Sequence, residues 1–474
     1  MQINKNKMFF QITLIFCDIL LINLGYILAF LIKFGWGIPE RNLAPYFSTW
    51  PWLTLSALAL FYFYRLYSGY RWRWAEVFAS LICVVFFQAI VGMALSFLFR
   101  EFAFPRTVLL AAPFIQLALL SLWRRAAWHM ERNLQGTRQV VVVGQLPEAP
   151  ALAEKLESVA DGIIKVSGLV LDSQFGSDYP ASTDQELKEK GSASFCGVAN
   201  RWPLLGELPE FCQCLDAVKP DQVFVCSNLS QEHKAKVIDA CVAKDMKVFL
   251  VPDLYEIMLT QARLDQVDDV PIFAVGRLKI PEESMILKRL VDIILSLATL
   301  VVAAPLCILV GLAVKLDSPG PVLYRQKRLT MQEKPFYLFK FRTMVVNAEQ
   351  ESGPVLALEN DPRVTRVGRL LRAARIDEIP QLLNVLRGDM SIVGPRPERP
   401  FFVNELVKQT PEYVYRMNVK SGITGLAQIA GRYSTSPENK LKYDLLYTKS
   451  YSLARDLAIL LQTVKVILMK DRAS

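Results

Sequence analysis

Histidine is almost absent from this chain, and its cysteines show no paired spacing. The 474 residues include two histidines and eight cysteines, and no C-x-x-C pair occurs among them. His129 and His233 cannot complete a zinc site in any standard spacing, so the sequence excludes a structural zinc module. The cysteine usage indicates reduced thiols that face the cytosol or lie in a membrane.

The chain also has no recognisable nucleic-acid module, although it is basic. Lys and Arg number 54 against 45 Asp and Glu, which gives a formal net charge of +9. Without a zinc-finger spacing or an RRM aromatic signature, that excess indicates anionic lipid or phosphorylated ligands. Hydrophobic residues make up 52% of the sequence and charged residues 21%, a combination that favours a membrane part joined to a soluble part.

Four apolar runs lie within residues 1–135. They cover Phe9–Ile32, Phe47–Tyr64, Val77–Phe99 and Thr107–Trp123. A helix needs about 20 apolar residues to cross a bilayer. The runs, two of them extended by their flanks, therefore predict a four-helix transmembrane α bundle.

Basic residues near the ends of these runs predict the orientation. They precede the first run, follow the fourth, and occur between the second and third at Arg65, Arg71 and Arg73. This bias predicts a cytoplasmic N-terminus and a cytoplasmic remainder of the chain. Asp18 lies inside the first run and is a functional candidate by its position, but we expect it to pair within the bundle or lie near a helix end.

Residues 136–280 alternate short apolar runs with polar helical stretches. The apolar runs are 139–144, Ile164–Leu171, Gln222–Cys226 and Lys247–Val251. This alternation predicts a Rossmann-like α/β domain with a parallel sheet. The turn after the first run holds one glycine, Gly144, and Glu148 in that turn would repel a phosphate. We therefore expect a structural, oligomerising or regulatory role in preference to dinucleotide binding.

A further apolar run covers residues 288–316 and is interrupted by Pro305. A proline inside a helix removes a hydrogen bond and kinks the axis. Basic residues at both ends, Lys288-Arg289 and Lys315, suit two ends on the same side of a membrane. The run therefore predicts a re-entrant helix that breaks at Pro305. The alternative, a fifth ordinary span, would place the C-terminal third outside the cell.

The adjacent carboxylates Asp377 and Glu378 are the candidate catalytic residues. Of two neighbouring carboxylates, one can attack while the other binds a metal or moves a proton. A solvated helix N-terminus would explain the pair equally well. Helical spacing predicts that Asp377, Gln381 and Asn384 share one face. The apolar face would hold Ile376, Ile379, Leu383 and Leu386.

Cationic residues surround this pair in the sequence. Arginine recurs at every third position from Arg363 to Arg375, which sweeps the side chains around a helix axis. Some of these side chains suit bidentate phosphate binding and others lipid headgroups. The stiff turn at 394–397 presents Arg396. The candidate phosphate-binding residues are Lys340, Arg342, Arg372 and Arg396.

Four stretches between residues 324 and 433 carry a resemblance to a known family. They read KFRTM, DPRVTRVGRLLR, IDEIPQLLNVLRGDMSIVGPRP and GITGLAQIAGR. This part resembles the bacterial sugar transferase domain of polyprenyl-phosphate hexose-1-phosphate transferases, the large monotopic phosphoglycosyl transferases. The layout is similar over nearly the whole chain. The resemblance implies a multi-domain membrane protein with domains at 1–135, 136–280 and 281–474, the last a mainly α catalytic domain.

The resemblance implies a covalent mechanism. Asp377 would attack the sugar-side phosphate of a UDP-sugar, UMP would leave, and undecaprenyl phosphate would take the phosphosugar from the aspartyl intermediate. Glu378, together with Asp377, is tied by the resemblance to Mg²⁺ and to activation of the acceptor. Pro395, Arg396 and Pro397 would hold the nucleotide. The implied step initiates exopolysaccharide, capsule or O-antigen synthesis at the bacterial inner membrane, with the soluble domains in the cytoplasm.

Several positions depart from the family pattern. Thr330 and Glu333 stand where glycines are usual, and Ser421 stands where proline is usual. Arg375 replaces a small polar residue, and Ala304 stands where serine is often found. These departures affect loop shape and donor choice. We expect UDP-glucose in preference to UDP-galactose, and a homodimer as the oligomeric state.

Two other classes of function remain as alternatives. A membrane-anchored nucleotide-sugar dehydratase needs an intact glycine fingerprint and a Tyr-x-x-x-Lys pair, and after residue 130 no tyrosine is followed four places later by lysine. A non-enzymatic scaffold of a polysaccharide assembly complex would not need the carboxylate pair. Removal of magnesium separates these possibilities, because it would stop the enzyme and leave a scaffold unaffected.

Overall fold

The computed structural model describes residues 2–68, 73–100, 104–160, 162–172, 201–260, 262–275, 278–346, 361–431 and 435–469. Arg71, one of the residues that predict orientation, lies outside them. The chain divides into two compact units, Met1–Asp253 and Leu254–Ser474. The three-domain division made from the sequence remains a prediction beside these two units.

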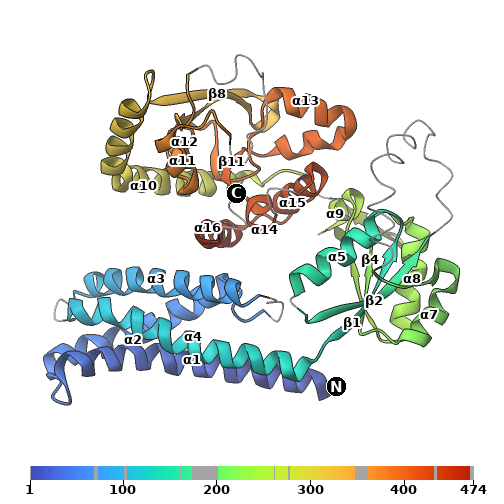
Figure 1. Cartoon of the computed structure of the whole chain (residues 1–474), viewed down its shortest axis with the longest axis horizontal. Helices are drawn as coiled ribbons and strands as arrows, with labels where there is room; N and C mark the ends of the chain where they lie inside the picture. Colours follow the sequence, from blue (N-terminus) through green and yellow to red (C-terminus); the bar gives the residue numbers. More distant parts are fainter. Residues whose placement is uncertain are drawn as a thin grey trace. The chain divides into compact units, whose positions relative to one another are not determined.

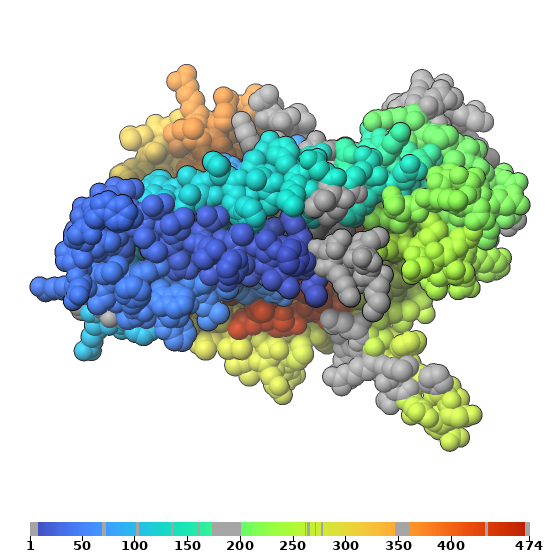
Figure 2. All heavy atoms as spheres, turned by 90° about the horizontal axis from the view of Figure 1, so that it is seen from below, coloured from blue at the N-terminus to red at the C-terminus, as the bar shows by residue number. Residues whose placement is uncertain are grey.

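Four long helices form the N-terminal part of the first unit, as the apolar runs predict. They are α1 (Gln2–Phe34), α2 (Glu40–Phe63), α3 (Trp74–Leu98) and α4 (Arg106–Gln135). Each helix begins before its apolar run. The first and last of them, α1 and α4, lie side by side along much of their length (Figures 1 and 2).

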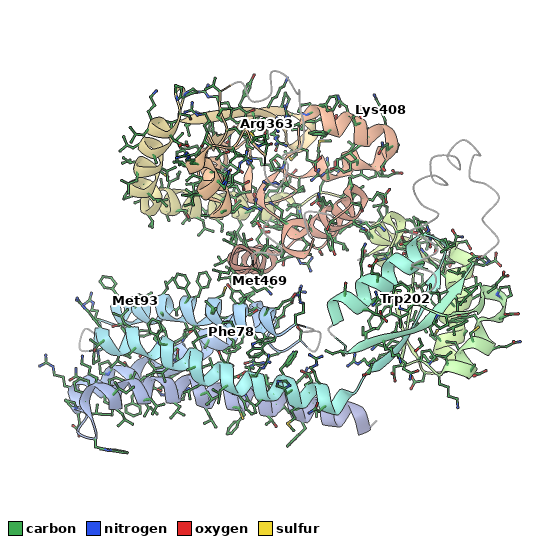
Figure 3. All side chains as sticks on the ribbon, viewed as in Figure 1. Phe78, Met93, Trp202, Arg363, Lys408 and Met469 are labelled. Carbon is green, nitrogen blue, oxygen red and sulfur yellow. The ribbon has the colours of Figure 1, made fainter. Side chains whose placement is uncertain are left out.

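Length and composition make α1, α3, α4 and a later helix, α10 (Glu282–Asp317), able to cross a membrane. α2, which contains Pro45 and Pro51, does not meet the same criterion among the described residues. Large apolar side chains are exposed on these helices, among them Phe78 and Met93 on α3 (Figure 3). Such extended apolar surfaces need a lipid environment, so the helices are those of a membrane protein.

A buried ion pair joins α1 to α4. The Arg124 guanidinium donates to both carboxylate oxygens of Asp18, with Nε 3.1 Å from Oδ1. Its Nη1 also donates to the Leu66 carbonyl at 2.8 Å, and the guanidinium lies over the rings of Phe61 and Tyr67. The expectation that Asp18 pairs within the bundle is confirmed. The pair fixes the register of α1 against α4, because in the part of the chain that the structure describes neither charge has another partner of opposite sign that is as close.

A five-stranded parallel sheet follows the helices. Its order is β3-β2-β1-β4-β5, and every neighbouring pair is parallel. The strands are β1 (Arg138–Gly144), β2 (Ile164–Leu171), β3 (Leu204–Glu207), β4 (Gln222–Val225) and β5 (Lys247–Leu250). The helices of this part are α5 (Glu148–Ala160), α7 (Phe211–Val218) and α8 (Gln231–Ala243). Four strands agree with the sequence prediction; the short β3 has too few apolar residues to be recognised.

The turn after β1 is held to the segment after β4 by the side chain of Glu148. Glu148 accepts hydrogen bonds from the Ser227 hydroxyl at 2.7 Å and from the backbone N–H groups of Ser227 and Asn228 at 3.3 and 3.1 Å. These groups follow β4, beside the point where the strand order reverses, which is where such sheets bind phosphates. Glu148 therefore occupies donors that a nucleotide phosphate would use.

The described residues of the second unit are mostly helical and also form three two-stranded sheets. Its strands are β6 (Arg263–Val267) with β7 (Val270–Ala274), β8 (Leu323–Leu329) with β9 (Pro335–Phe341), and β10 (Ser391–Val393) with β11 (Gly422–Thr424). Besides α10, its helices are α9 (Leu254–Leu259), α11 (Arg366–Ala373), α12 (Gln381–Arg387), α13 (Pro400–Gln409), α14 (Leu426–Ala430), α15 (Pro437–Lys449) and α16 (Leu453–Leu468). One hydrophobic cluster joins β9, α12, β10, α15 and α16 through Leu338, Val385, Val393, Tyr447 and Ile459.

Helix α10 bends along its length, so that its two arms run in different directions (Figure 1). Pro305 lies inside the helix and has no N–H to donate. Most of its apolar side chains are exposed, while the buried Lys288 and Asp292 face the unit. Lys288 Nζ lies 2.6 Å from Asp456 Oδ2, and Asp292 Oδ1 accepts from Ile392 N at 3.1 Å. Buried polar contacts thus attach an otherwise apolar helix to the soluble unit.

The Asp18–Arg124 pair gives the first testable prediction. Arg124→Leu should lower the free energy of unfolding of the detergent-solubilised protein by about 3–5 kcal/mol, because it leaves a buried carboxylate without its cation. The double variant Asp18→Leu with Arg124→Leu should recover most of that loss. Thermal unfolding followed by circular dichroism measures both. Equal losses in the single and double variants would contradict a pairing role.

Candidate active site

Two short helical segments hold the carboxylate pair. Helix α11 ends at Ala373, Arg375 takes a left-handed conformation with φ 57°, and a single 3-10 turn covers Ile376–Glu378 before α12 begins. Asp377, Gln381 and Asn384 are all buried, as a shared face would require, but Asp377 lies in the 3-10 turn and the other two lie in α12. The predicted apolar face is not the buried one, because Leu383 is exposed. Pro380, which cannot donate, separates the turn from α12.

Asn384 explains why the polar face is buried. Its Nδ2 donates to the Tyr337 carbonyl at 2.8 Å, and its Oδ1 accepts from Phe339 N at 3.0 Å. The side chain therefore pairs with β9 in the manner of a neighbouring strand. Because β9 also carries Lys340, this contact fixes the distance between that cation and the carboxylates.

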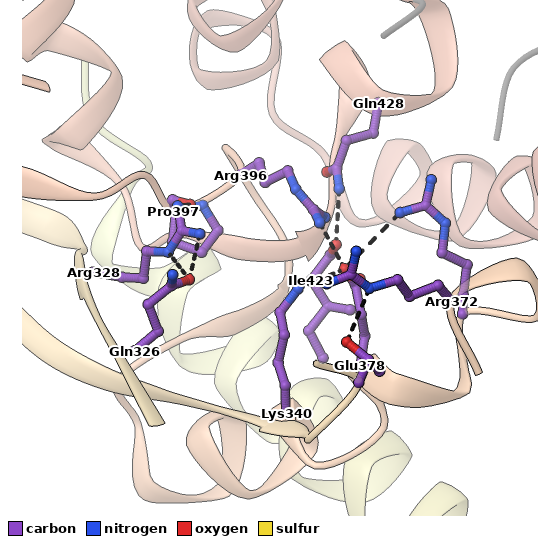
Figure 4. A network of polar contacts seen from close by, with 11 residues as sticks. Gln326, Arg328, Lys340, Arg372, Glu378, Arg396, Pro397, Ile423 and Gln428 are labelled. Carbon is purple, nitrogen blue, oxygen red and sulfur yellow. Dashed lines mark hydrogen bonds and ion pairs between the residues drawn. The ribbon is translucent and has the colours of Figure 1, made fainter. Parts of the chain in front are cut away.

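Glu378 is held by two cations from distant parts of the chain. Its Oε1 lies 3.0 Å from Lys340 Nζ and 2.6 Å from Arg396 Nη2 (Figure 4). Burial alone would raise the pKa of Glu378, but Arg396 and Lys340 hold it well below the usual range. Burial lowers the pKa of Lys340, an effect that Glu378 opposes. Glu378 is therefore an ionised carboxylate at neutral pH.

Asp377 has the opposite environment. The residue is 7% exposed, and its Oδ1 is buried without a hydrogen-bond partner among the described residues. Burial raises the pKa of Asp377, and the Coulombic attraction of Lys340 counteracts this in part. A carboxylate oxygen that accepts no hydrogen bond from the protein is a better nucleophile and metal ligand than one that does, because no such bond must be broken first.

The other predicted phosphate-binding residues divide into two groups. Arg372 donates through Nε to the Thr343 hydroxyl at 2.9 Å and lies close enough to Asp377 to lower its pKa. Arg342 lies at the end of α10, where its Nη groups donate to the carbonyls of Pro319 and Ser318. The structure thus brings Arg372 to the carboxylates and uses Arg342 to cap a helix.

The loop of Pro395–Glu398 is fixed along its whole backbone. Its four carbonyls each accept a hydrogen bond. The donors are, in order, Gly422 N at 2.8 Å, Arg416 Nη2 at 3.0 Å, Arg328 Nη1 at 3.2 Å and Leu329 N at 3.1 Å. This clamp presents the Arg396 side chain to Glu378 with little conformational freedom.

Arg416 is a functional residue that the sequence does not indicate. Its guanidinium is buried and contacts Asp444 at 2.9 Å, Glu398 at 2.8 Å and the Tyr413 hydroxyl. Burial raises the pKa of Asp444 to about 6 although Arg416 opposes it. Arg416 stands outside any motif of charged residues. Its contacts become visible only when α15 packs against the 3-10 segment Pro411–Asn418.

Two of the departures from the family pattern contact each other. Ser421 donates to the Thr330 hydroxyl through its backbone N at 3.2 Å and through Oγ at 3.0 Å. Thr330 in turn donates to the Asp389 carbonyl at 2.9 Å. A proline at 421 would lack the N–H and a glycine at 330 would lack its acceptor. The two substitutions therefore form a matched pair, and both residues line a small pocket beside Arg396.

The carboxylate pair also suits a divalent cation. Among the described residues no cluster of three or more Asp, Glu, His or Cys side chains forms a protein cage for a metal. Mg²⁺ is commonly held by one or two carboxylates together with water and substrate phosphates. The unpaired Oδ1 of Asp377 next to the ionised Glu378 fits that mode of binding.

The Arg416 cluster generates a stability prediction. Arg416→Leu should lower the free energy of unfolding by about 3–5 kcal/mol near neutral pH, because it removes the cation that contacts the buried Asp444 and the partly buried Glu398. The loss should shrink at about pH 5, since a carboxyl with a raised pKa binds its proton more readily in the folded state. Thermal unfolding at both pH values measures this, with Lys408→Met on the exposed face of α13 as the control. A loss independent of pH would contradict the argument.

Comparison with known proteins places this site in a family. Residues 283–470 match the model described as "Bacterial sugar transferase". The UDP-glucose:undecaprenyl-phosphate glucose-1-phosphate transferase of Klebsiella pneumoniae is 30% identical over 97% of this chain and 96% of its own length.

Two further relatives differ in how much of the chain they cover. The Escherichia coli (strain K12) protein of the same name is 37% identical over 56% of this chain and 58% of its own length. The UDP-galactose-lipid carrier transferase of Erwinia amylovora is 26% identical over 98% of this chain and 97% of its own length. The family model covers the part that holds Asp377 and Glu378, and the two matches over nearly the whole chain include the N-terminal helices. The chain therefore belongs to the bacterial sugar transferase family.

Proposed function

We propose that the protein transfers a hexose-1-phosphate from a UDP-sugar to undecaprenyl phosphate, releasing UMP and forming undecaprenyl-diphospho-sugar. The names of the relatives support the acceptor and the kind of group transferred. The observation that carries the proposal is the contrast between Asp377, buried with an unpaired oxygen, and Glu378, ionised between two cations.

In the first step Asp377 is the nucleophile. One of its carboxylate oxygens attacks the phosphorus on the sugar side of the donor, and a P–O bond to Asp377 forms. The bond from that phosphorus to the bridging oxygen breaks, and its electron pair leaves on UMP. A covalent intermediate splits one difficult transfer into two easier ones. The neighbouring cations Lys340, Arg372 and Arg396 oppose the negative charge that gathers on the phosphoryl oxygens.

In the second step the lipid phosphate takes the phosphosugar. An oxygen of undecaprenyl phosphate attacks the same phosphorus, the P–O bond to Asp377 breaks, and the carboxylate is regenerated with its electron pair. Glu378 orients Lys340 and Arg396 through both steps, and its negative charge offsets theirs before the donor binds. Asp377 and Glu378 would hold Mg²⁺, which neutralises part of the diphosphate charge when bound.

The setting of this reaction is the bacterial inner membrane. The apolar helices support a membrane protein, and the basic residues near their ends support soluble parts in the cytoplasm, where nucleotide sugars are made. The bend of α10 supports a re-entrant helix with both ends on that side. UDP-glucose is our preferred donor, and initiation of exopolysaccharide, capsule or O-antigen synthesis is the proposed role. A homodimer is part of the proposal, and light scattering that showed only monomer would remove it.

The role of Asp377 is tested by substitution. Asp377→Asn should abolish both UMP release from a panel of UDP-sugars and the formation of a phosphosugar-labelled protein, because the amide is not a nucleophile. A radiolabelled donor without acceptor, followed by denaturing gels, measures the covalent species. Glu405→Gln on the exposed face of α13 is the control. Covalent labelling or UMP release by Asp377→Asn at the wild-type level would refute the mechanism. If the wild type releases no UMP from any donor, the scaffold alternative is favoured.

The environment of Asp377 also predicts the pH dependence. The attack requires the ionised carboxylate, whose pKa is raised by burial. The rate of UMP release should therefore fall on the acid side at a pH above the usual range of an aspartate. Lys340 opposes that rise, so Lys340→Met should move the acid limb to higher pH and Lys340→Arg should leave it nearly in place. Profiles of kcat/KM against pH measure this shift. An acid limb at the same pH in wild type and both variants would contradict the effect of Lys340 on Asp377.

A further inference from the structure

Arg328 on β8 is a cation of the site that has no carboxylate partner. Its Nε and Nη2 donate to Gln326 Oε1 at 3.0 and 2.6 Å, and its Nη1 donates to the Pro397 carbonyl at 3.2 Å. Among the residues that the structure describes, no Asp or Glu oxygen lies within 4.0 Å of it. Lys340 and Arg396 differ in this respect, because both are paired with Glu378.

The surroundings of Arg328 leave its charge uncompensated. Burial lowers the pKa of Arg328 to about 10, and the nearby cations Arg396 and Arg399 contribute to this lowering. Glu398 opposes it but is itself paired with Arg416 at 2.8 Å. A partly buried cation among other cations is unfavourable on its own, and a bound anion would relieve it.

Arg328 also retains hydrogen-bond donors for such an anion. A guanidinium carries five N–H groups, and three are used by Gln326 and Pro397. The two that remain, one on each Nη, are fixed in direction because both neighbouring contacts hold the plane of the group. Figure 4 shows Arg328 and Arg372 on opposite sides of Arg396. The cations therefore form a row, with the carboxylates near the Arg372 end and Arg328 at the other.

A nucleotide sugar carries two adjacent phosphates, and Arg328 lies near Arg396 on the side away from Arg372 (Figure 4). The proposed reaction places the sugar-side phosphate next to Asp377, which leaves the nucleoside-side phosphate further along the row. We propose that Arg328 binds the nucleoside-side phosphate of the donor and stabilises UMP as it leaves; this inference rests on the proposed function. When the bridging P–O bond breaks, the electron pair stays on the UMP phosphate. Arg328 remains protonated and strengthens its hydrogen bonds as that charge develops.

Strand geometry offers matched variants. Gln326 and Arg328 lie two positions apart and project from the same face of β8, whereas Lys327 projects from the other face and is exposed. Gln326→Glu keeps the shape of the side chain and its acceptor oxygen, so the contact of Arg328 with Pro397 is retained. It adds a negative charge next to the guanidinium, which would compete with a phosphate.

The test compares inhibition by UMP with inhibition by uridine, which lacks the phosphate. In the full-length protein in detergent, Arg328→Gln and Gln326→Glu should each raise the inhibition constant of UMP about tenfold to a hundredfold. The inhibition constant of uridine should stay within about twofold of its wild-type value. Arg328→Lys should recover part of the UMP affinity, and Lys327→Gln should match wild type for both ligands. Direct UMP binding is measured alongside, so the result does not depend on turnover.

The two proposals fail in different ways. If wild type binds UMP but releases none from any UDP-sugar, the proposed function fails while the binding data still report on Arg328. If Gln326→Glu and Arg328→Gln bind UMP as wild type does, Arg328 serves only to hold the Pro397 carbonyl and the inference is overturned. If the variants weaken binding of UMP and binding of uridine equally, the inference is also overturned. That pattern indicates a displaced loop and not a lost phosphate contact. Thermal unfolding of each variant identifies a protein that has failed to fold.

Discussion

The architecture of the site depends on one shared carboxylate. Glu378 joins Lys340, which lies 38 positions earlier on β9, to Arg396, which lies 18 positions later in the 395–398 loop. Each of these charges would be unfavourable in a buried setting without the others. The contact therefore does more than add stability. It ties the positions of the strand, the turn and the loop to one another.

Adjacent residues in the chain have opposite electrostatic environments as a result. The turn at Ile376–Glu378 directs Glu378 towards the cations and leaves an oxygen of Asp377 buried without a partner. The pKa of the first is lowered and that of the second is raised. Pairs of titratable groups separated in this way divide the roles of reacting group and fixed charge. The positive φ of Arg375, just ahead of the turn, is the backbone feature that permits the separation.

The sequence predicts the parts of this protein that depend on local pattern. Apolar runs identify α1 to α4, and alternation identifies four of the five strands of the parallel sheet. The carboxylate pair and Arg396 follow from motif spacing. The positions of Arg416 and Arg328 could not be predicted, because only folding brings the carbonyls of Arg396 and Pro397 to them. The prediction for Arg342 failed for the same reason. Its position near Lys340 in the sequence suggested a ligand-binding group, but its guanidinium donates to carbonyls at the end of α10.

The turn after β1 shows what an internal ligand does to a nucleotide-binding fold. Glu148 fills with its carboxylate the donors at Ser227 and Asn228. A bound cofactor stabilises its protein by an amount that grows with the logarithm of its free concentration. A carboxylate attached to the same chain is present at a constant effective concentration, whatever the metabolic state of the cell. The turn after β1 is therefore held in place by a group of the chain itself and needs no added ligand.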